Sequence, residues 1–219
     1  MGRKRIGLLG GTFNPIHSGH LRAARLVQER FSLDRVLFVP SYIPPHKESS
    51  DIAAPSDRLK MVELALRGFT QFAVSSVEIE ARGKSYSIFT LEKIKHLHPE
   101  AWIFFILGTD AFLEIETWRN YERLLEESLF IVIHRPGYCL RDAWEVLGGK
   151  FREKIHQVSE SEKIEDGLFS SFRIFLLAID TLDISSTEIR RRIREGKPLK
   201  SLLPEKVEAY ISENKLYQR

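Results

Sequence analysis

Two histidines stand among glycines in the run GGTFNPIHSGH, which occupies residues 10–20. A short apolar stretch precedes this run, and a helical pattern follows it. A glycine-rich turn that leads from a strand into a helix forms an anion site, because unpaired backbone N–H groups and the positive helix end point to one place. His17 and His20 at this junction can donate hydrogen bonds to phosphoryl oxygens. We therefore expect phosphate chemistry here, although a structural turn with satisfied histidines is the simpler alternative.

The remaining residues of the run fit the same site. Gly10 and Gly11 let the backbone approach a ligand, and Asn14-Pro15 favours a turn. Gly19 removes a side chain where a phosphate would press on the helix start. The helix end lowers the pKa of a nearby imidazole and a bound polyphosphate raises it, so the sequence leaves the balance open. There is no P-loop pattern and no G-x-G-x-x-G spacing, which disfavours a dinucleotide dehydrogenase.

A second candidate phosphate site lies near the end of the chain. Ser185-Ser186-Thr187-Glu188 has the pattern of a capping box that opens a helix, and Arg190 follows within one turn. Hydroxyls and free N–H groups at such a start can hold phosphate. Simple capping with solvated arginines explains the residues equally well. We expect the neighbouring Arg191, Arg192 and Arg194 to form a solvated or anion-facing surface.

Three further segments place polar or aromatic residues in loops. Pro44-Pro45-His46-Lys47 is a stiff extended segment that delivers a cation, or else a rigid surface loop. Gly108-Thr109-Asp110 follows an apolar strand, and taken alone Asp110 is better explained as a helix cap. Trp118 lies beyond it, where an indole is more often part of the core than a ligand platform.

Short apolar runs alternate with helical patterns along the chain. Several runs are continuously apolar, which is typical of strands buried on both faces. This alternation predicts an α/β fold with a doubly wound, mostly parallel, Rossmann-like sheet and a helical C-terminal segment. The candidate strands are Ile6–Leu9, Val36–Val39, Ala73–Ile79, Trp102–Leu107, Leu129–Ile133, Ile174–Ile179 and, more weakly, Ile155–Val158. The candidate helices are Gly19–Arg30, Asp57–Leu66, Ser87–His98, Tyr121–Glu127, Thr187–Glu195 and Pro204–Asn214.

Length and composition restrict the class of protein. The 219 residues fit a single domain, residues 1–219, in which 185–219 form a helical segment. The net charge of +3 does not argue for a nucleic-acid partner. The longest apolar runs are too short to cross a membrane. Cys139 is the only cysteine, which excludes an intrachain disulfide and fits the cytoplasm. A loop is expected at 159–167, and a homo-oligomer is left open.

The run Gly10 to Leu21 resembles the HxGH signature of the nucleotidylyltransferase superfamily. The fuller string GGTFNPIHSGHL is similar to bacterial nicotinate-nucleotide adenylyltransferases. Ser87 departs from the family, which usually has threonine there, but it keeps a hydroxyl. Further blocks fit that family in order: Pro44-Pro45-His46-Lys47, Ser85-Tyr86-Ser87, Gly108-Thr109-Asp110, Trp118, Arg135-Pro136-Gly137 and Ile184 to Arg190.

The resemblance implies a reaction that joins ATP and nicotinate mononucleotide, with Mg²⁺ bound through the ATP phosphates and no metal site on the protein. The implied catalytic residues are His17, His20, Lys47 and Arg190. The implied ATP-binding residues are Gly10, Gly11, Thr12, Phe13, Gly19, Gly108, Asp110, Arg135, Ser186 and Thr187. The implied pyridine-nucleotide residues are Ser85, Tyr86, Ser87 and Trp118.

Alternatives remain at this stage. The acceptor of the adenylyl group could instead be nicotinamide mononucleotide or phosphopantetheine. From other classes, the chain could be a non-catalytic nucleotide sensor, or an RNA-binding module that uses the basic surface from Arg190 to Lys200, although no aromatic-rich RNA motif is present.

Overall fold

The computed structural model describes residues 2–43, 52–180 and 182–218. Its sheet has seven parallel strands in the order β3-β2-β1-β4-β5-β7-β6. The chain therefore winds away from β1 in both directions, which confirms the doubly wound α/β prediction. The strands are β1 (Arg5–Gly11), β2 (Arg35–Pro40), β3 (Phe72–Val74), β4 (Trp102–Gly108), β5 (Leu129–Ile133), β6 (Ile155–Val158) and β7 (Ile174–Leu177).

The continuously apolar runs form the interior strands, as predicted. All five residues of β5 are buried, and so are the five central residues of β4. The register is parallel on both sides of β5, with Ile131 level with Ile106 on β4 and with Phe175 on β7. Strands that are covered on both faces lose the alternation of polar and apolar residues, because neither face contacts water.

The chain forms two compact units, which are described separately. Unit 1 comprises Met1–Leu9, Ala23–Val36 and Tyr86–Thr181, and unit 2 comprises Gly10–Arg22, Leu37–Ser85 and Leu182–Arg219. The expectation of a single domain over the whole chain stays a prediction.

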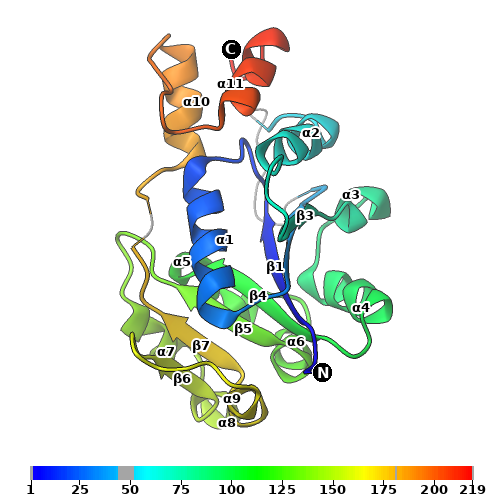
Figure 1. The fold of residues 1–219 in the computed structure, drawn as a ribbon, viewed down its shortest axis with the longest axis vertical. Helices are drawn as coiled ribbons and strands as arrows, with labels where there is room; N and C mark the ends of the chain where they lie inside the picture. Colours follow the sequence, from blue (N-terminus) through cyan, green and yellow to red (C-terminus); the bar gives the residue numbers. More distant parts are fainter. Residues whose placement is uncertain (1, 44–51, 181, 219) are drawn as a thin grey trace. The chain divides into compact units, whose positions relative to one another are not determined.

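Unit 1 has an aromatic core. Phe104 on β4 and Phe175 on β7 both meet the rings of Phe31 and Phe169, with centroids 5.0–5.9 Å apart. Its helical segments, drawn largely in green and yellow in Figure 1, are α4 (Ser87–Leu97), α5 (Thr109–Phe112), η1 (Ile115–Thr117), α6 (Tyr121–Glu127), η2 (Leu140–Asp142), α7 (Ala143–Val146), α8 (Gly149–Arg152) and α9 (Asp166–Ser171).

Unit 2 is built largely from helices. In it, α11 packs against α2, and the hydroxyl of Tyr210 on α11 donates a 2.8 Å hydrogen bond to Asp57 on α2. Helix α1 begins in unit 2 and ends in unit 1. The helices are α1 (Ser18–Phe31), α2 (Pro55–Ala65), α3 (Val77–Ala81), α10 (Ser186–Arg194) and α11 (Glu205–Glu213).

Two predicted segments are wrong in part. The run Ala73–Ile79 is not one strand, because β3 ends at Val74 and α3 begins at Val77. Glu78 and Glu80 in the first turn of α3 favour that helix start. The predicted loop at 159–167 ends early, because α9 begins at Asp166, whose carboxylate lies 2.7 Å from the Arg5 guanidinium.

Candidate functional site

The turn between β1 and α1 has an unusual backbone. Phe13 has a φ of 48°, in the left-handed region that few residues other than glycine adopt, and its side chain is only 2% exposed. The Asn14-Pro15 peptide bond is cis. Asn14, Pro15, Ile16 and His17 are all buried. The predicted turn is therefore a packed element of unit 2 and not an exposed loop.

Asn14 connects this turn to three distant segments of unit 2 through hydrogen bonds. Its side-chain oxygen accepts hydrogen bonds from the Tyr217 hydroxyl at 2.7 Å and from the backbone N–H of Ala53 at 3.0 Å. Its backbone carbonyl accepts a 2.9 Å hydrogen bond from the Arg190 guanidinium. Burial raises the pKa of Tyr217 in spite of the positive charges of Arg190 and Arg58, so the phenol remains a donor.

Arg58 on α2 holds the other side of the turn. Its side chain is fully buried, and its guanidinium donates to the carbonyls of Thr12, Ser41, Tyr42 and Ala53 at 2.7–3.0 Å. Burial lowers its pKa from the usual value. All four carbonyls lie in segments outside the helices and strands, where no neighbouring strand or helical turn of the described chain supplies a donor. One side chain therefore gives these backbone groups the hydrogen bonds that burial requires.

The two histidines stack on each other at the start of α1. Their ring centroids are 3.6 Å apart, with an angle of 25° between the planes. The backbone N–H of His17 donates to Nδ1 of His20 at 3.2 Å. Because Nδ1 accepts, neutral His20 carries its proton on Nε2, which makes that nitrogen a donor for a ligand. Phe13 supports the pair with an edge contact to His20 at 5.1 Å.

The structure shows a second reason for Gly19, besides the predicted space for a phosphate. A Cβ at this position would lie 3.0 Å from Nδ1 of His17 and 3.4 Å from the carbonyl oxygen of Leu182. The missing side chain therefore makes room for the His17 ring. Gly10, by contrast, is exposed and has nothing within 4 Å of an added Cβ.

The capping prediction for α10 is confirmed. The Ser185 hydroxyl accepts the Glu188 N–H at 3.1 Å, and the Ser186 hydroxyl donates to the Pro15 carbonyl at 2.9 Å. Thr187 is exposed, and its hydroxyl lies 3.5 Å from the Arg190 guanidinium. Ser186 and Arg190 thus contact the same turn that carries the histidines. The structure brings four of the predicted phosphate-binding side chains together in unit 2: His17, His20, Ser186 and Arg190.

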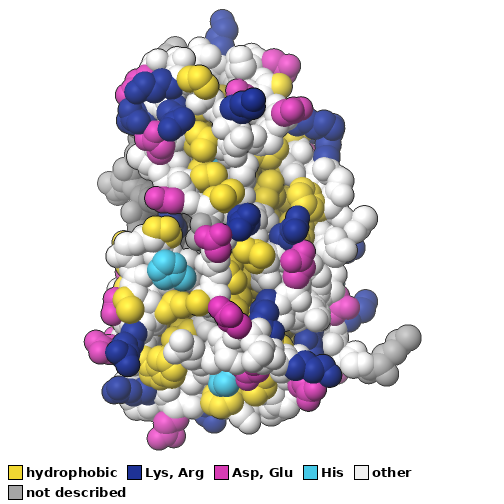
Figure 2. Space-filling model, turned by 60° about the vertical axis from the view of Figure 1, so that its left-hand side comes forward, with side chains coloured by type: hydrophobic (Ala, Val, Ile, Leu, Met, Phe, Trp, Pro, Cys, Tyr) yellow, Lys and Arg dark blue, Asp and Glu magenta, His cyan; other side chains and the backbone are white. Residues whose placement is uncertain are grey.

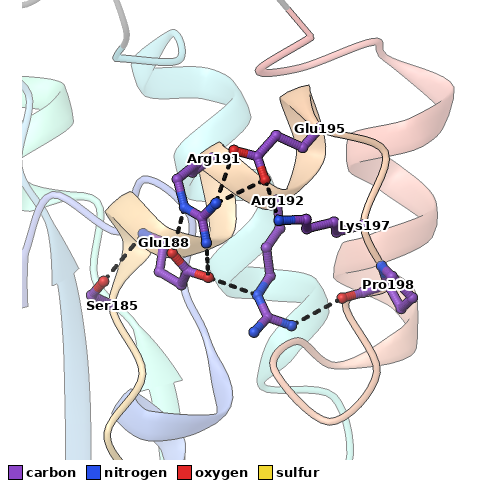
Figure 3. Close-up of polar contacts among 7 residues, drawn as sticks. All are labelled: Ser185, Glu188, Arg191, Arg192, Glu195, Lys197 and Pro198. Atoms are coloured by element: carbon purple, nitrogen blue, oxygen red, sulfur yellow. Dashed lines mark hydrogen bonds and ion pairs between the residues drawn. The ribbon is translucent and has the colours of Figure 1, made fainter.

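Arg191 and Arg192 lie at the surface, as expected for a solvated face, but both side chains have carboxylate partners on their own helix. Arg191 pairs with Glu188 and Glu195, and Arg192 pairs with Glu188, all at 2.8 Å (Figure 3). Hydrogen bonds from the two arginines lower the pKa of Glu188 to about 2. These charges compensate each other along the helix and leave no uniform basic surface.

Two predicted ATP-binding residues meet in unit 1. The Arg135 guanidinium lies 3.0 Å from one carboxylate oxygen of Asp110, and the other oxygen is buried with no hydrogen-bond donor among the described residues. The capping role for Asp110 is wrong, because Gly108 is the N-cap of α5. A side chain on Gly108 would collide with the Asp110 carboxylate, which explains the glycine. Cys139 is exposed, further along the segment that carries Arg135.

The predicted pyridine-nucleotide residues divide between the units. Tyr86 and Ser87 open α4 in unit 1, and Trp118 follows η1 in the same unit. The guanidinium of Arg119 lies over the rings of Tyr86 and Phe89. Ser85 belongs to unit 2, where its hydroxyl accepts the Tyr42 N–H at 2.9 Å.

Some predictions concern residues or groups that the structure does not test. Lys47 and its neighbours from Pro44 lie outside the described residues. Within 2–43, 52–180 and 182–218, no three His, Cys, Asp or Glu side chains gather as metal ligands. No helix in the described part of the chain is long and apolar enough to cross a membrane.

Sequence reasoning missed Arg58, the Asn14 side chain and Tyr217. Arg58 left a signal, because it falls on the same helical stripe as Met61, Val62 and Ala65, which are all buried. An arginine on an apolar stripe indicates a buried cation with specific partners. The contact of Tyr217 with Asn14 joins residues that are far apart in the chain, and no local pattern predicts it.

Comparison with known proteins agrees with this geometry. Residues 8–192 match the family model described as cytidylyltransferase-like. A protein of Desulfatibacillum aliphaticivorans named "Probable nicotinate-nucleotide adenylyltransferase" is 43% identical over 217 residues, which cover 97% of this chain and 99% of that protein. A protein of the same name from Desulfitobacterium hafniense strain Y51 is 40% identical over 215 residues, which cover 98% of this chain and 96% of that protein.

Solved structures show the same fold. The nicotinic acid mononucleotide adenylyltransferase of Plasmodium falciparum complexed with NaAD superimposes with a TM-score of 0.72 at 20% identity, and 98% of each chain is covered. The same enzyme complexed with APC gives a TM-score of 0.70. The solved structures, at 20% identity, show the fold alone, whereas identity of 40% or more over nearly the whole chain shows the family. The chain belongs to the cytidylyltransferase-like family and, within it, to the nicotinate-nucleotide adenylyltransferases.

Proposed function

We propose that this chain transfers the adenylyl group of ATP to nicotinate mononucleotide, giving nicotinate adenine dinucleotide and pyrophosphate in NAD biosynthesis. The single observation that carries the proposal is the stacked pair of His17 and His20 in the packed turn of unit 2, in a chain that is 43% identical over nearly its whole length to a relative of that name.

The reaction needs no nucleophile from the protein. A phosphate oxygen of the mononucleotide attacks the α-phosphorus of ATP, and the bond from that phosphorus to the bridging oxygen of the β-phosphate breaks. The electron pair leaves with pyrophosphate. The protein accelerates this step by alignment and by stabilising negative charge in the transition state.

His20 is the residue that we place at the reacting phosphate. Its Nδ1 is engaged by the His17 N–H, so its Nε2–H is the donor, and the stacked His17 ring fixes its orientation. Arg190 supplies a positive charge beside the same turn. We also assign a phosphate-binding charge to Lys47, which lies outside the described residues. We assign the outer phosphates to the start of α10: the exposed Thr187 hydroxyl and the backbone N–H groups of Ser186 and Thr187 are the donors, because the Ser186 hydroxyl already donates to the Pro15 carbonyl. Gly10, Gly11, Thr12, Phe13 and Gly19 shape the turn.

In unit 1 we assign the Asp110–Arg135 pair and Gly108 to the adenosine part of ATP. The buried carboxylate oxygen of Asp110 is an acceptor without a donor among the described residues, and hydroxyl or amino groups of a nucleoside are donors. Tyr86, Ser87 and Trp118 bind the pyridine nucleotide, together with Ser85.

Magnesium enters as part of the nucleotide. The described residues of the turn present imidazole and guanidinium nitrogens, which suit phosphate oxygens and not a hard cation. We therefore propose that Mg²⁺ is bound through the ATP phosphates, where it neutralises charge on the departing pyrophosphate. The lone, exposed Cys139 fits a reducing compartment, and we propose the cytoplasm as the location.

An RNA-binding role is disfavoured. Arg191, Arg192 and Lys197 pair with Glu188 or Glu195 on the same surface, and basic and acidic side chains are interspersed over the face shown in Figure 2. Phosphate backbones bind to uncompensated positive charge.

Pyrophosphate release tests the proposal. Wild-type protein is incubated with MgATP and one acceptor: nicotinate mononucleotide, nicotinamide mononucleotide or phosphopantetheine. We expect the highest kcat/KM with the first. His20→Ala is expected to lower kcat about a hundredfold or more, because it removes a donor at the transition state.

His96→Ala is the matched control, because His96 is exposed on α4. It should leave kcat unchanged. A protein that binds ATP but releases no pyrophosphate with any acceptor is a sensor, and that result rejects the enzyme. Full activity of His20→Ala rejects the assigned role even if the reaction is right.

A further inference from the structure

Arg119 in unit 1 has an uncompensated positive charge. The residue is exposed, directly follows Trp118, and makes no ion pair with a carboxylate in the described part of the chain. Its guanidinium carbon instead lies 5.0 Å from the ring centroid of Tyr86 and 5.1 Å from that of Phe89. Phe89 is itself 44% exposed.

Nearby cations of unit 1 are compensated. Arg123 on α6 lies 2.7 Å from Glu92 and 2.6 Å from Glu127. Lys95 also pairs with Glu127, at 3.0 Å. Arg119 therefore differs from its neighbours in having aromatic rings, and no acid, as its partners.

The two rings contact the guanidinium without a carboxylate taking up its hydrogen bonds. The ring planes of Tyr86 and Phe89 stand at 86° to each other, so the planar cation can lie flat on at most one of them, and the N–H donors that do not point at the other ring stay available. A guanidinium held in this way is prepared to bind a carboxylate with two parallel hydrogen bonds, at little further cost in side-chain entropy.

We propose that Arg119 is a specificity residue that favours an acceptor with a carboxylate on its aromatic ring over one with a carboxamide. This inference rests on the proposed function and on the assignment of Tyr86 and Trp118 to the pyridine ring. The acid carries a negative charge that the fixed cation attracts. The amide carries no charge. Its NH₂ group is itself a donor, so it cannot accept a hydrogen bond from the guanidinium, and only the amide oxygen can.

The test compares kcat/KM for nicotinate mononucleotide and nicotinamide mononucleotide in wild type, Arg119→Gln and Arg119→Lys. Arg119→Gln should lower the value for the acid about tenfold or more, since a charge-assisted pair is lost, and should change the value for the amide less than about twofold. Arg119→Lys should fall between wild type and Arg119→Gln, because it keeps the charge and loses the planar fork.

Arg123→Gln is the control for loss of one positive charge in unit 1, and its preference for the acid should equal that of wild type. Calorimetric dissociation constants for both mononucleotides are measured in parallel, so that slow turnover of the amide does not limit the comparison. We expect only the constant for the acid to rise in Arg119→Gln.

Equal losses for both acceptors in Arg119→Gln, or an unchanged ratio, would overturn the assignment of Arg119 while leaving the adenylyltransferase intact. Absence of turnover by the wild-type protein with both mononucleotides would instead reject the proposed function. The two failures are therefore distinguishable.

Discussion

At the residue scale, the proposed site depends on how the two histidines are oriented. A hydrogen bond from the His17 N–H fixes the tautomer of neutral His20, and ring stacking fixes its plane. Gly19 gives the His17 ring the space that this arrangement needs. A small displacement of a transition-state donor is costly, because catalysis here depends on alignment.

Gly19→Ala tests this arrangement. The new methyl group would lie 3.0 Å from Nδ1 of His17, so the ring must move. We expect kcat to fall about tenfold or more. Thermal stability should stay the same or fall slightly, because displacement of the buried His17 ring offsets the preference of helices for alanine over glycine, which is up to about 1 kcal/mol.

Gly167→Ala is the matched control, since Gly167 is a helical glycine of α9 with nothing within 4 Å of an added Cβ. It should keep full activity. Wild-type kcat in Gly19→Ala would show that the position of the His17 ring does not matter for the reaction.

At the element scale, α10 combines a capped start with an internal ion-pair network. Ser185 caps its first turn, and Glu188 binds two arginines on the following turn (Figure 3). The helix is short and strongly charged, so these contacts add to the stability that burial of Ile189 provides.

Glu188→Gln should change how stability depends on pH. Hydrogen bonds from Arg191 and Arg192 lower the pKa of Glu188 in the folded protein to about 2, whereas a free glutamate titrates near 4.5. Its contribution to stability is therefore present above pH 4.5 and is lost as the pH falls toward 2. The difference in urea midpoint between wild type and variant should therefore be largest near pH 7 and should disappear near pH 2.

Glu213→Gln, at the exposed end of α11, serves as the comparison and should change the midpoint little at any pH. A difference between wild type and Glu188→Gln that stays constant down to pH 2 would show that the ion pairs seen in α10 do not lower this pKa.

Elements were predictable wherever a local pattern determines them. Strand β5 and helix α6 have the predicted bounds, Leu129–Ile133 and Tyr121–Glu127. An uninterrupted apolar run specifies a strand covered on both faces, and local propensities specify short helices. The prediction of one strand at 73–79 is wrong because the apolar residues of this segment fit the period of a strand and that of a helix equally well. Only Phe72–Val74 pairs with a neighbouring strand.

The candidate site was predictable in its residue types and less so in its supports. The glycines, the histidines and the capping serine lie in short motifs, which can be recognised from the sequence alone. Arg58 and Tyr217 act on the turn from far along the chain. Such partners depend on packing between segments, and one sequence gives no local sign of which segments will meet.

At the scale of the whole molecule, Arg58 joins three segments that lie outside the helices and strands. One guanidinium serves carbonyls of the histidine turn, of the segment after β2, and of the segment before α2. Unit 2 therefore depends on a buried polar centre as well as on apolar packing.

Arg58→Met should destabilise the protein strongly. The substitution leaves four carbonyls without their donor, and each buried unsatisfied group costs about 1–3 kcal/mol before relaxation. We expect the free energy of unfolding in urea to fall by about 3 kcal/mol or more.

Arg67→Met provides the reference, because Arg67 is exposed just beyond the end of α2. It should change stability by less than about 0.5 kcal/mol. If both variants were equally stable, the carbonyl contacts of Arg58 would not contribute to unit 2 as described.

The position of Cys139 has a practical consequence. The chain has one cysteine, its thiol is exposed, and it lies on the segment that carries Arg135. A maleimide fluorophore therefore attaches at a single place, in unit 1. Its emission would report whether a nucleotide binds at the Asp110–Arg135 pair, the adenosine site proposed above, independently of pyrophosphate release.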